Sequence, residues 1–318
     1  MQQSFGSYFE LELQRRNDYI FHSDSILLNT GRNALEYIIK AYNIKKIYLP
    51  FLSCEALLTP VKRVKIQYAF YPVDNNQEPI FDYNTLSDSD FLLYINYFGL
   101  KNHIIENLTS KVKNLIIDNT QAFFSLPLKQ TPTFYSTRKF FGVADGALLC
   151  NVSSKIQLNI DKSSKRMMHL MLRAENESDI GYSSYLKTEI NLNKLPLMEM
   201  SELTKKILLS VDFQLHREMR NANFSFLADS FHMINKYSFN SYDGPMAYPL
   251  WIENGGLIKK RLKESKVYIP TLWPNVLNST EEDSIEFDMV NNILPIPVDK
   301  RYSYTSLREV VTLIRKLL

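Results

Sequence analysis

Cysteine, histidine and glycine are all scarce in this chain of 318 residues. The only two cysteines, Cys54 and Cys150, are far apart and form no Cys-x-x-Cys pair, so we expect reduced thiols. The five histidines lack metal-ligand spacing, and we expect no metal site. The nine glycines include no G-x-G-x-x-G run and no Walker lysine–serine pair, which argues against the common nucleotide-binding loops.

Strong net charge and long apolar runs are also missing. The net charge of +3 comes without a basic block, so we expect no nucleic-acid partner. The longest apolar runs, such as residues 89–100, have the length of a strand and are too short to cross a bilayer. The first 19 residues carry acids and lack the apolar centre of a signal peptide. With reduced thiols, these absences predict a cytoplasmic protein without a membrane partner.

What is present is an alternation of strand-like and helix-like segments over residues 26–151. Apolar runs predict strands at 45–50, 66–73, 91–99, 115–118, 133–136 and 146–152. Between them, helical spacing predicts helices at 32–44, 54–64 (broken at Pro60) and 103–114. Apolar strands alternating with helices indicate an α/β fold with a mostly parallel sheet covered on both faces. Functional side chains of such sheets gather at the carboxyl ends of the strands.

The second half of the chain has a different pattern. We expect helical structure in the polar stretch 152–195, one long helix at 199–231, and then a smaller unit. That unit has predicted strands at 246–252, 267–274 and 292–298, and helices at 256–265 and 303–318. We therefore predict a large domain over 1–215 and a small C-terminal α+β domain over 216–318.

Three positions have the residue types that a pyridoxal 5'-phosphate (PLP) site requires. Asp118 ends an apolar strand, and Lys139 follows a later strand just before a Gly-containing turn. A lysine can form a Schiff base with the PLP aldehyde, and an acid can pair with its pyridine nitrogen. Gly31 opens a helix, whose first backbone N–H groups suit a phosphate. Taken alone, Gly31 is typical of a turn, Asp118 of a capping acid and Lys139 of a surface lysine. The order of the three along the chain nevertheless favours a PLP site.

These segments resemble the motifs of the sugar-nucleotide aminotransferases of the DegT/DnrJ/StrS family, which are PLP enzymes of fold type I. "NTGRNALEYI" is similar to the family's phosphate turn, "IIDNTQAFF" to its Glu-Asp-x-Ala-Gln-Ala, and "STRKFFGVADGALL" to its lysine segment. The resemblance implies that Gly31 and Arg32 contact the phosphate and that Asp118 pairs with the pyridine nitrogen. It also implies that Gln121 lies near the ring oxygen and that Lys139 is the Schiff-base lysine.

The phosphate-binding residues depart from the family pattern in two places. The family's serine, five residues before the lysine, is replaced by Phe134, so Ser136 is the predicted replacement, with Thr137 and Arg138 as alternatives. The family's Asn-x-Arg, which adds a phosphate contact from a second subunit, is replaced by residues 197–199 of the segment "PLMEMSEL".

The ring-binding residues depart in a third place. The aromatic residue that stacks on the cofactor ring in the family aligns with Cys54. Tyr97 or Phe98 is the predicted stacking residue in its place.

The resemblance implies a homodimeric aminotransferase that uses PLP. It would move an amino group from an amino acid, glutamate by analogy, to a nucleotide-linked keto sugar in amino-sugar or surface-polysaccharide biosynthesis. Two alternatives stay open. One is a PLP enzyme of different chemistry, although relatives that dehydrate sugars have a histidine where this chain has Lys139. The other is a non-catalytic relative that binds a sugar nucleotide or a partner protein.

Overall fold

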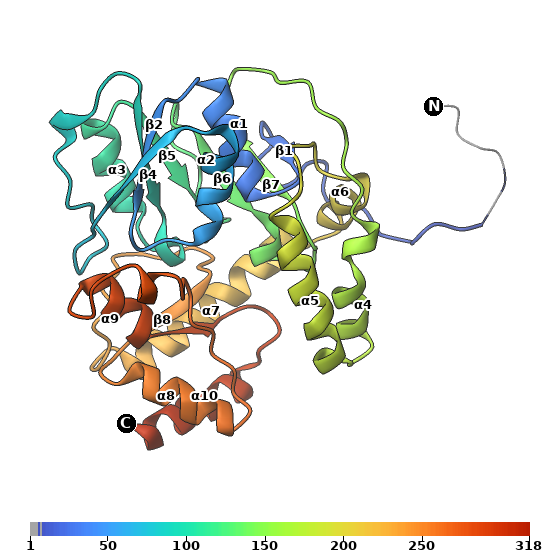
Figure 1. Ribbon diagram of the computed structural model, residues 1–318. Helices are drawn as coiled ribbons and strands as arrows, with labels where there is room; N and C mark the ends of the chain where they lie inside the picture. Colours follow the sequence, from blue (N-terminus) through green and yellow to red (C-terminus); the bar gives the residue numbers. More distant parts are fainter. Residues whose placement is uncertain (1–5, 7) are drawn as a thin grey trace.

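The computed structural model describes residue 6 and residues 8–318 of the chain, and a seven-stranded sheet is its central element (Figure 1). In order across the sheet, the strands are β1 (Ile26–Leu28), β7 (Ala147–Cys150), β6 (Thr133–Ser136), β5 (Leu115–Asp118), β4 (Asp90–Ile95), β2 (Lys46–Pro50) and β3 (Gln67–Tyr71). The run from β6 to β3 is parallel, and β7 is antiparallel to both of its neighbours. This is the mostly parallel sheet that the alternating pattern predicts.

Burial on both faces explains the apolar strands. Every residue of β4, β5, β6 and β7 is buried, so side chains on both faces of the sheet are covered. The first three helices are α1 (Gly31–Ala41), α2 (Leu58–Val64) and α3 (Asn102–Lys111). They connect strands that follow one another in the chain: β1 to β2, β2 to β3 and β4 to β5. Because parallel strands run in one direction, the last residues of β4 and β5, Ile95 and Asp118, lie side by side, and β6 continues past them to Ser136.

The second half of the chain forms a helical hairpin and a smaller unit. The hairpin consists of α4 (Met168–Ala174) and α5 (Ser178–Leu192), and it stands beside the C-terminal unit in Figure 1. Two helices, α6 (Glu202–Leu209) and α7 (Phe213–Phe231), lead to that unit. Its elements are β8 (Ala247–Trp251), α8 (Gly255–Glu264), α9 (Ile285–Asn292), β9 (Ile293–Pro297) and α10 (Tyr304–Leu317), and β8 pairs with β9 antiparallel.

Three expectations from the sequence are wrong. The helix expected over 199–231 is two helices, because the chain leaves helical geometry before Asp212, whose side chain caps α7 by accepting the amide of Leu215 at 2.9 Å. Residues 267–274 form no strand, and β8 pairs with β9 instead. Pro60 does not break its helix, because it lies in the first turn of α2, where a backbone N–H has no intrahelical acceptor.

The strand predicted over 91–99 already ends at Ile95, and a 3₁₀ turn follows it at Tyr97–Gly99. The other predicted strands and helices are confirmed, with shifts of their ends by a few residues. The predicted domain boundary at 215/216 falls in the first turn of α7, and it stays a prediction. In the part of the chain that the structure describes, no helix is both long enough and apolar enough to cross a membrane.

Candidate functional site

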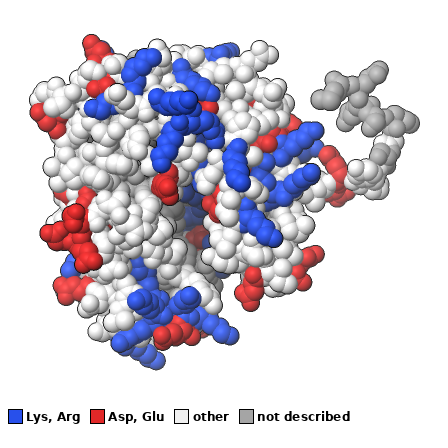
Figure 2. Space-filling model, viewed as in Figure 1, with Lys and Arg blue, Asp and Glu red and all other residues white. Residues whose placement is uncertain are grey.

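A cavity of about 430 Å³ opens at the carboxyl ends of β4, β5 and β6. One wall comes from these strand ends and from the first residues of α1, and another comes from α5. The C-terminal unit contributes Met246 and the loop 270–273. Figure 2 shows the face of the molecule with a furrow beside the α4–α5 hairpin and with basic and acidic side chains intermixed. The cavity therefore lies where three parts of the chain meet.

An acid and an amine face this cavity. Asp118 ends β5 and is buried, and burial raises the pKa of its carboxyl group, while Lys139 opposes that rise. Lys139 ends a short 3₁₀ turn after β6 and is accessible from the cavity. The surrounding protein nevertheless displaces water and lowers the pKa of its ammonium group, while Asp118 raises it. Opposed shifts of this kind in a cleft are typical of functional groups.

The turn that carries Lys139 is fixed by hydrogen bonds to the two residues that precede the next strand, β7. The Thr137 hydroxyl donates to the carbonyl oxygens of Asp145 and Gly146, at 2.8 and 3.0 Å. The Gly146 amide donates in turn to the carbonyl of Asn29, at 2.7 Å. The lysine-bearing turn is thereby connected to the segment between β1 and α1, where the other wall of the cavity begins.

Positive groups gather on the α1 side of the cavity. Gly31 and Arg32 are the first residues of α1, so their amides have no intrahelical acceptor. Burial lowers the pKa of both Arg32 and Arg138. Within the described residues, the Arg32 Nε is buried without a hydrogen-bond partner, and Arg138 forms an ion pair with Glu189 of α5. This arrangement can bind an anion.

The structure brings together most of the predicted site residues. Those that line the cavity are Gly31, Arg32, Cys54, Asp118, Gln121, Ser136 and Lys139. The Gln121 Oε1 accepts the amide of Phe98 at 2.8 Å, which fixes the orientation of its side-chain amide. Phe134, at the position of the family's serine, also lines the cavity.

Neither candidate for the stacking residue lines the cavity: Phe98 is buried in the core, and so is Tyr97. It is fully buried, and its hydroxyl donates to the carbonyl of Leu52 at 3.0 Å. Its ring packs edge-on against Tyr94 and Trp273, and of these three rings only that of Trp273 lines the cavity. The ring of Tyr97 is therefore part of the core, because its hydroxyl is satisfied there and its faces are covered.

Several lining residues had no place in the prediction. Thr120 accepts a hydrogen bond from the Lys139 Nζ at 3.0 Å, and its position inside the Asp118–Gln121 motif was the available signal. Tyr185 and Glu189 also line the cavity, and their spacing of four residues puts them on one face of α5. The loop 270–273 gave no signal, because its apolar residues indicate a strand.

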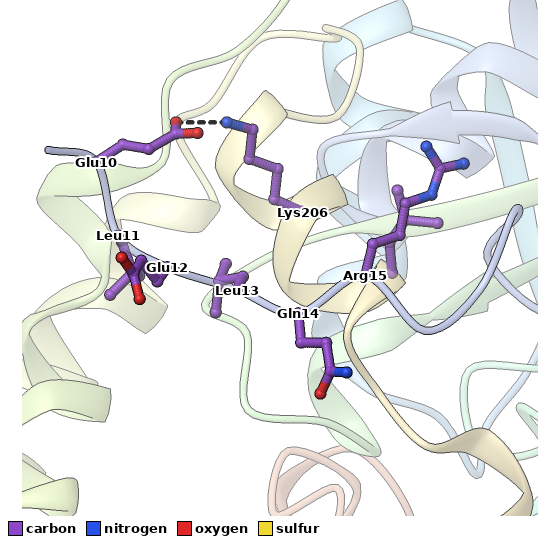
Figure 3. A pocket seen from close by; sticks show the side chains of 8 residues that line it. Glu10, Leu11, Glu12, Leu13, Gln14, Arg15 and Lys206 are labelled. Atoms are coloured by element: carbon purple, nitrogen blue, oxygen red, sulfur yellow. Dashed lines mark hydrogen bonds and ion pairs between the residues drawn. The ribbon is translucent and has the colours of Figure 1, made fainter.

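A second hollow, of about 680 Å³, lies between residues 10–15 and α6 (Figure 3). Glu10 and Lys206 form an ion pair there at 2.6 Å, but both side chains are exposed, so the pair stabilises the fold by about 0–1 kcal/mol at most. In residues 6 and 8–318, no group of three or more His, Cys, Asp or Glu side chains is arranged to hold a metal ion. The cavity with Asp118 and Lys139 is accordingly the better candidate.

Comparison with known proteins gives a result only at the level of structure. No family model matches the sequence, and no curated protein matches it significantly. Among solved structures, the sugar aminotransferase CalS13 from Micromonospora echinospora is similar at a TM-score of 0.63 and 14% identity, over 93% of this chain and 88% of that one. NtdA from Bacillus subtilis, solved with bound cofactor PMP, gives 0.66 and 11%, over 92% and 73%.

A third similar structure is the aminotransferase TlmJ from Streptoalloteichus hindustanus, at a TM-score of 0.62 and 14% identity, over 92% of this chain and 85% of that one. The chain has the fold of these aminotransferases. This aminotransferase fold confirms the predicted fold type I class, with its mostly parallel sheet and its smaller C-terminal unit. At such low identity the likeness establishes the fold, and the roles of individual residues have to be argued from the local geometry.

Proposed function

We propose that this protein is a PLP-dependent aminotransferase. It would move an amino group from an amino acid, glutamate by analogy, to a keto sugar carried on a nucleotide, in amino-sugar or surface-polysaccharide biosynthesis. The observation that carries the proposal is that Asp118 and Lys139 face one cavity at the strand ends of an aminotransferase fold. The description of CalS13 as a sugar aminotransferase and the PMP bound to NtdA support the substrate class and the cofactor.

The cavity has the groups that PLP requires. When bound, this cofactor supplies an electron sink that stabilises negative charge on the carbon bearing the amine. Lys139 would hold its aldehyde carbon, and Asp118 would pair with its pyridine nitrogen. Burial raises the pKa of Asp118, but a cation beside the carboxylate favours ionisation, as Lys139 already does. Asp118 is therefore placed to pair with a protonated ring nitrogen of PLP. Gln121 lines the same cavity and has a side chain that can form hydrogen bonds.

The phosphate would lie among the positive groups near α1. The amides of Gly31 and Arg32, the unpartnered Arg32 Nε and the guanidinium of Arg138 are all donors. A Cβ placed on Gly31 would lie 3.9 Å from the Ser136 Cβ, so that hydroxyl is close to the start of α1. These donors can replace the family's missing serine, while Cys54 contributes a small side chain to the same cavity.

Arg138→Ala should weaken PLP binding by roughly tenfold to a hundredfold, the effect of losing one charge-assisted hydrogen bond. The measurement is a titration of the apoprotein with PLP, followed by visible absorbance. Arg173→Ala is the matched control, because Arg173 is an exposed residue of α4 and should leave the affinity unchanged. Equal affinities for Arg138→Ala and wild type would remove Arg138 from the phosphate site.

Lys139 would also move the proton during aminotransfer. Its lowered pKa increases the fraction of neutral amine near neutral pH, and a neutral amine can accept a proton from the α-carbon of the amino donor. The same Nζ, once protonated, can donate that proton at a neighbouring carbon. The ionised form of Asp118, which Lys139 and Thr120 favour, would favour the protonated state of a basic ring nitrogen beside it.

The test of the proposal is a half-reaction. PLP-loaded protein mixed with glutamate should release 2-oxoglutarate and lose its yellow colour, and one of a set of nucleotide-linked keto sugars should then restore the colour. Release of 2-oxoglutarate without any response to these keto sugars would contradict the sugar substrate alone. Failure of the wild-type protein to bind PLP would favour the non-catalytic alternative.

We further propose a homodimer that works in the cytoplasm. Ile180, Leu186 and Ile190 are exposed apolar residues of α5, which supports contact with a second copy. The free thiols of Cys54 and Cys150 suit a reducing compartment. Light scattering of the purified protein tests the dimer, because a mass near 37.2 kDa would indicate a monomer.

A further inference from the structure

Thr120 joins three parts of the cavity through three different groups. Its backbone N–H donates to the Asp118 Oδ1 at 2.8 Å, and its hydroxyl accepts from the Lys139 Nζ at 3.0 Å. Its methyl carbon would lie 3.4 Å from a Cβ placed on Gly31, so it packs against the start of α1. Thr120 is buried, with 9% of its surface exposed, whereas the Lys139 side chain that it contacts is accessible from the cavity.

The hydroxyl at this position is a departure of this chain. The motif that "IIDNTQAFF" resembles has alanine where Thr120 stands, and alanine has no group that can accept a hydrogen bond from an amine. Within the described residues, the bond to Thr120 is the only hydrogen bond that the Lys139 Nζ makes. A lysine side chain has several rotatable bonds, so one well-placed acceptor decides where its amine rests.

We infer that Thr120 is a positioning residue that holds the amine of Lys139 beside Asp118. A hydroxyl accepts and donates at the same time, so after accepting from Nζ it still has its own proton to direct toward the acid. The backbone and the side chain of Thr120 both favour the ionised form of Asp118 against the effect of burial. Thr120 thereby connects the two groups on which the proposed chemistry depends.

The inference rests on the proposed function for its catalytic meaning, but its physical consequence can be measured without cofactor. An acceptor 3.0 Å from Nζ stabilises the charged ammonium more than the neutral amine. Loss of that acceptor should therefore lower the pKa of Lys139. A Thr120 side chain that only filled space would leave the titration of Lys139 where it is.

The experiment compares Thr120→Val, Thr120→Ala and Thr120→Ser in PLP-free protein. Each variant is labelled with a trace of acetic anhydride between pH 6 and pH 11, and mass spectrometry quantifies the modified peptides that contain Lys139 and, as internal reference, the exposed Lys129. Valine keeps the shape of threonine without the hydroxyl, alanine matches the related motif, and serine keeps the hydroxyl.

The labelling midpoint of Lys139 should move down by about 0.5–1 pH unit in the valine and alanine variants, and stay within about 0.2 unit of wild type in the serine variant. Below the midpoint, this corresponds to labelling about threefold to tenfold faster. An unchanged midpoint in both the valine and alanine variants would overturn the inference. So would a serine variant that shifts as far as they do. Either result leaves PLP binding by the wild-type protein as a separate question.

Discussion

Lys139→Ala should abolish covalent attachment of PLP and reduce aminotransfer by at least about 10²–10⁴-fold, the contribution of general acid–base catalysis alone. The amine of Lys139 is the group in the cavity that can bind an aldehyde and also exchange a proton, because the surrounding protein displaces water and lowers the pKa of its ammonium group. The measurement is borohydride reduction of the loaded protein, followed by mass spectrometry of the peptide that contains residue 139, and by the rate of 2-oxoglutarate release.

Lys129→Ala provides the comparison for this variant. Lys129 is exposed, lies ten residues earlier in the chain and does not line the cavity, so its loss should change neither the adduct nor the rate. A reduced adduct found on any lysine other than Lys139 in the wild-type protein would contradict the assignment. An adduct on Lys139 without aminotransfer to any acceptor would support a PLP enzyme of different chemistry.

Gly146→Ala should destabilise the fold and displace Lys139 at the same time. The Cβ of an alanine here would overlap the Thr137 Oγ1, and it would lie 3.1 Å from the Thr204 Cγ2, which is tighter than most packed contacts. Gly146 also has φ +105°, which L-residues rarely adopt, so the backbone alone contributes roughly 1–3 kcal/mol of destabilisation. The free energy of unfolding from urea denaturation should fall by at least that amount.

The second effect of this substitution follows from the hydrogen bonds of Thr137. To relieve the clash, the Thr137 hydroxyl has to move. This hydroxyl donates the two hydrogen bonds that hold the lysine-bearing turn, so the turn should shift as well. Gly142→Ala is the matched control in the same segment, because a Cβ at Gly142 meets no atom within 4 Å and its φ is not positive. Equal unfolding free energies for the two variants would show that the turn adapts without cost.

Much of this arrangement could be read from local patterns. The strands β4 to β7 are buried on both faces, so they appear in the sequence as short apolar runs, and helical spacing marks α1 and α3 between them. Parallel strands share one carboxyl edge, and this rule alone predicts that Asp118 and Lys139 lie at the same edge of the sheet. Local pattern was also sufficient for the start of α1, since Thr30 caps it by accepting the amide of Asn33.

The errors arise where long-range packing competes with local pattern. The helical pattern of the sequence continues through residues 210–212, but the structure has a break there. Asp212 begins a new helix, because its side chain accepts a hydrogen bond from the Leu215 amide, which a residue in the interior of a helix could not do. The apolar residues 267–274 have the composition of a strand, but a strand also needs hydrogen bonds to a neighbouring strand, and the small sheet contains only β8 and β9 among the described residues. Instead, this segment supplies Trp273 to the cavity and covers the ring of Tyr97.

Residue chemistry and order along the chain were enough to indicate an α/β fold and to select an acid, an amine and a helix start as a site, because these depend on strand ends and caps close in sequence. Other features depend on which distant segments of the chain meet. These are the contacts of Thr120, the ion pair between Arg138 and Glu189, and the burial of Tyr97 in the core. Hydrogen bonds and ion pairs act over a few ångströms, and one-dimensional order does not specify separations on that scale.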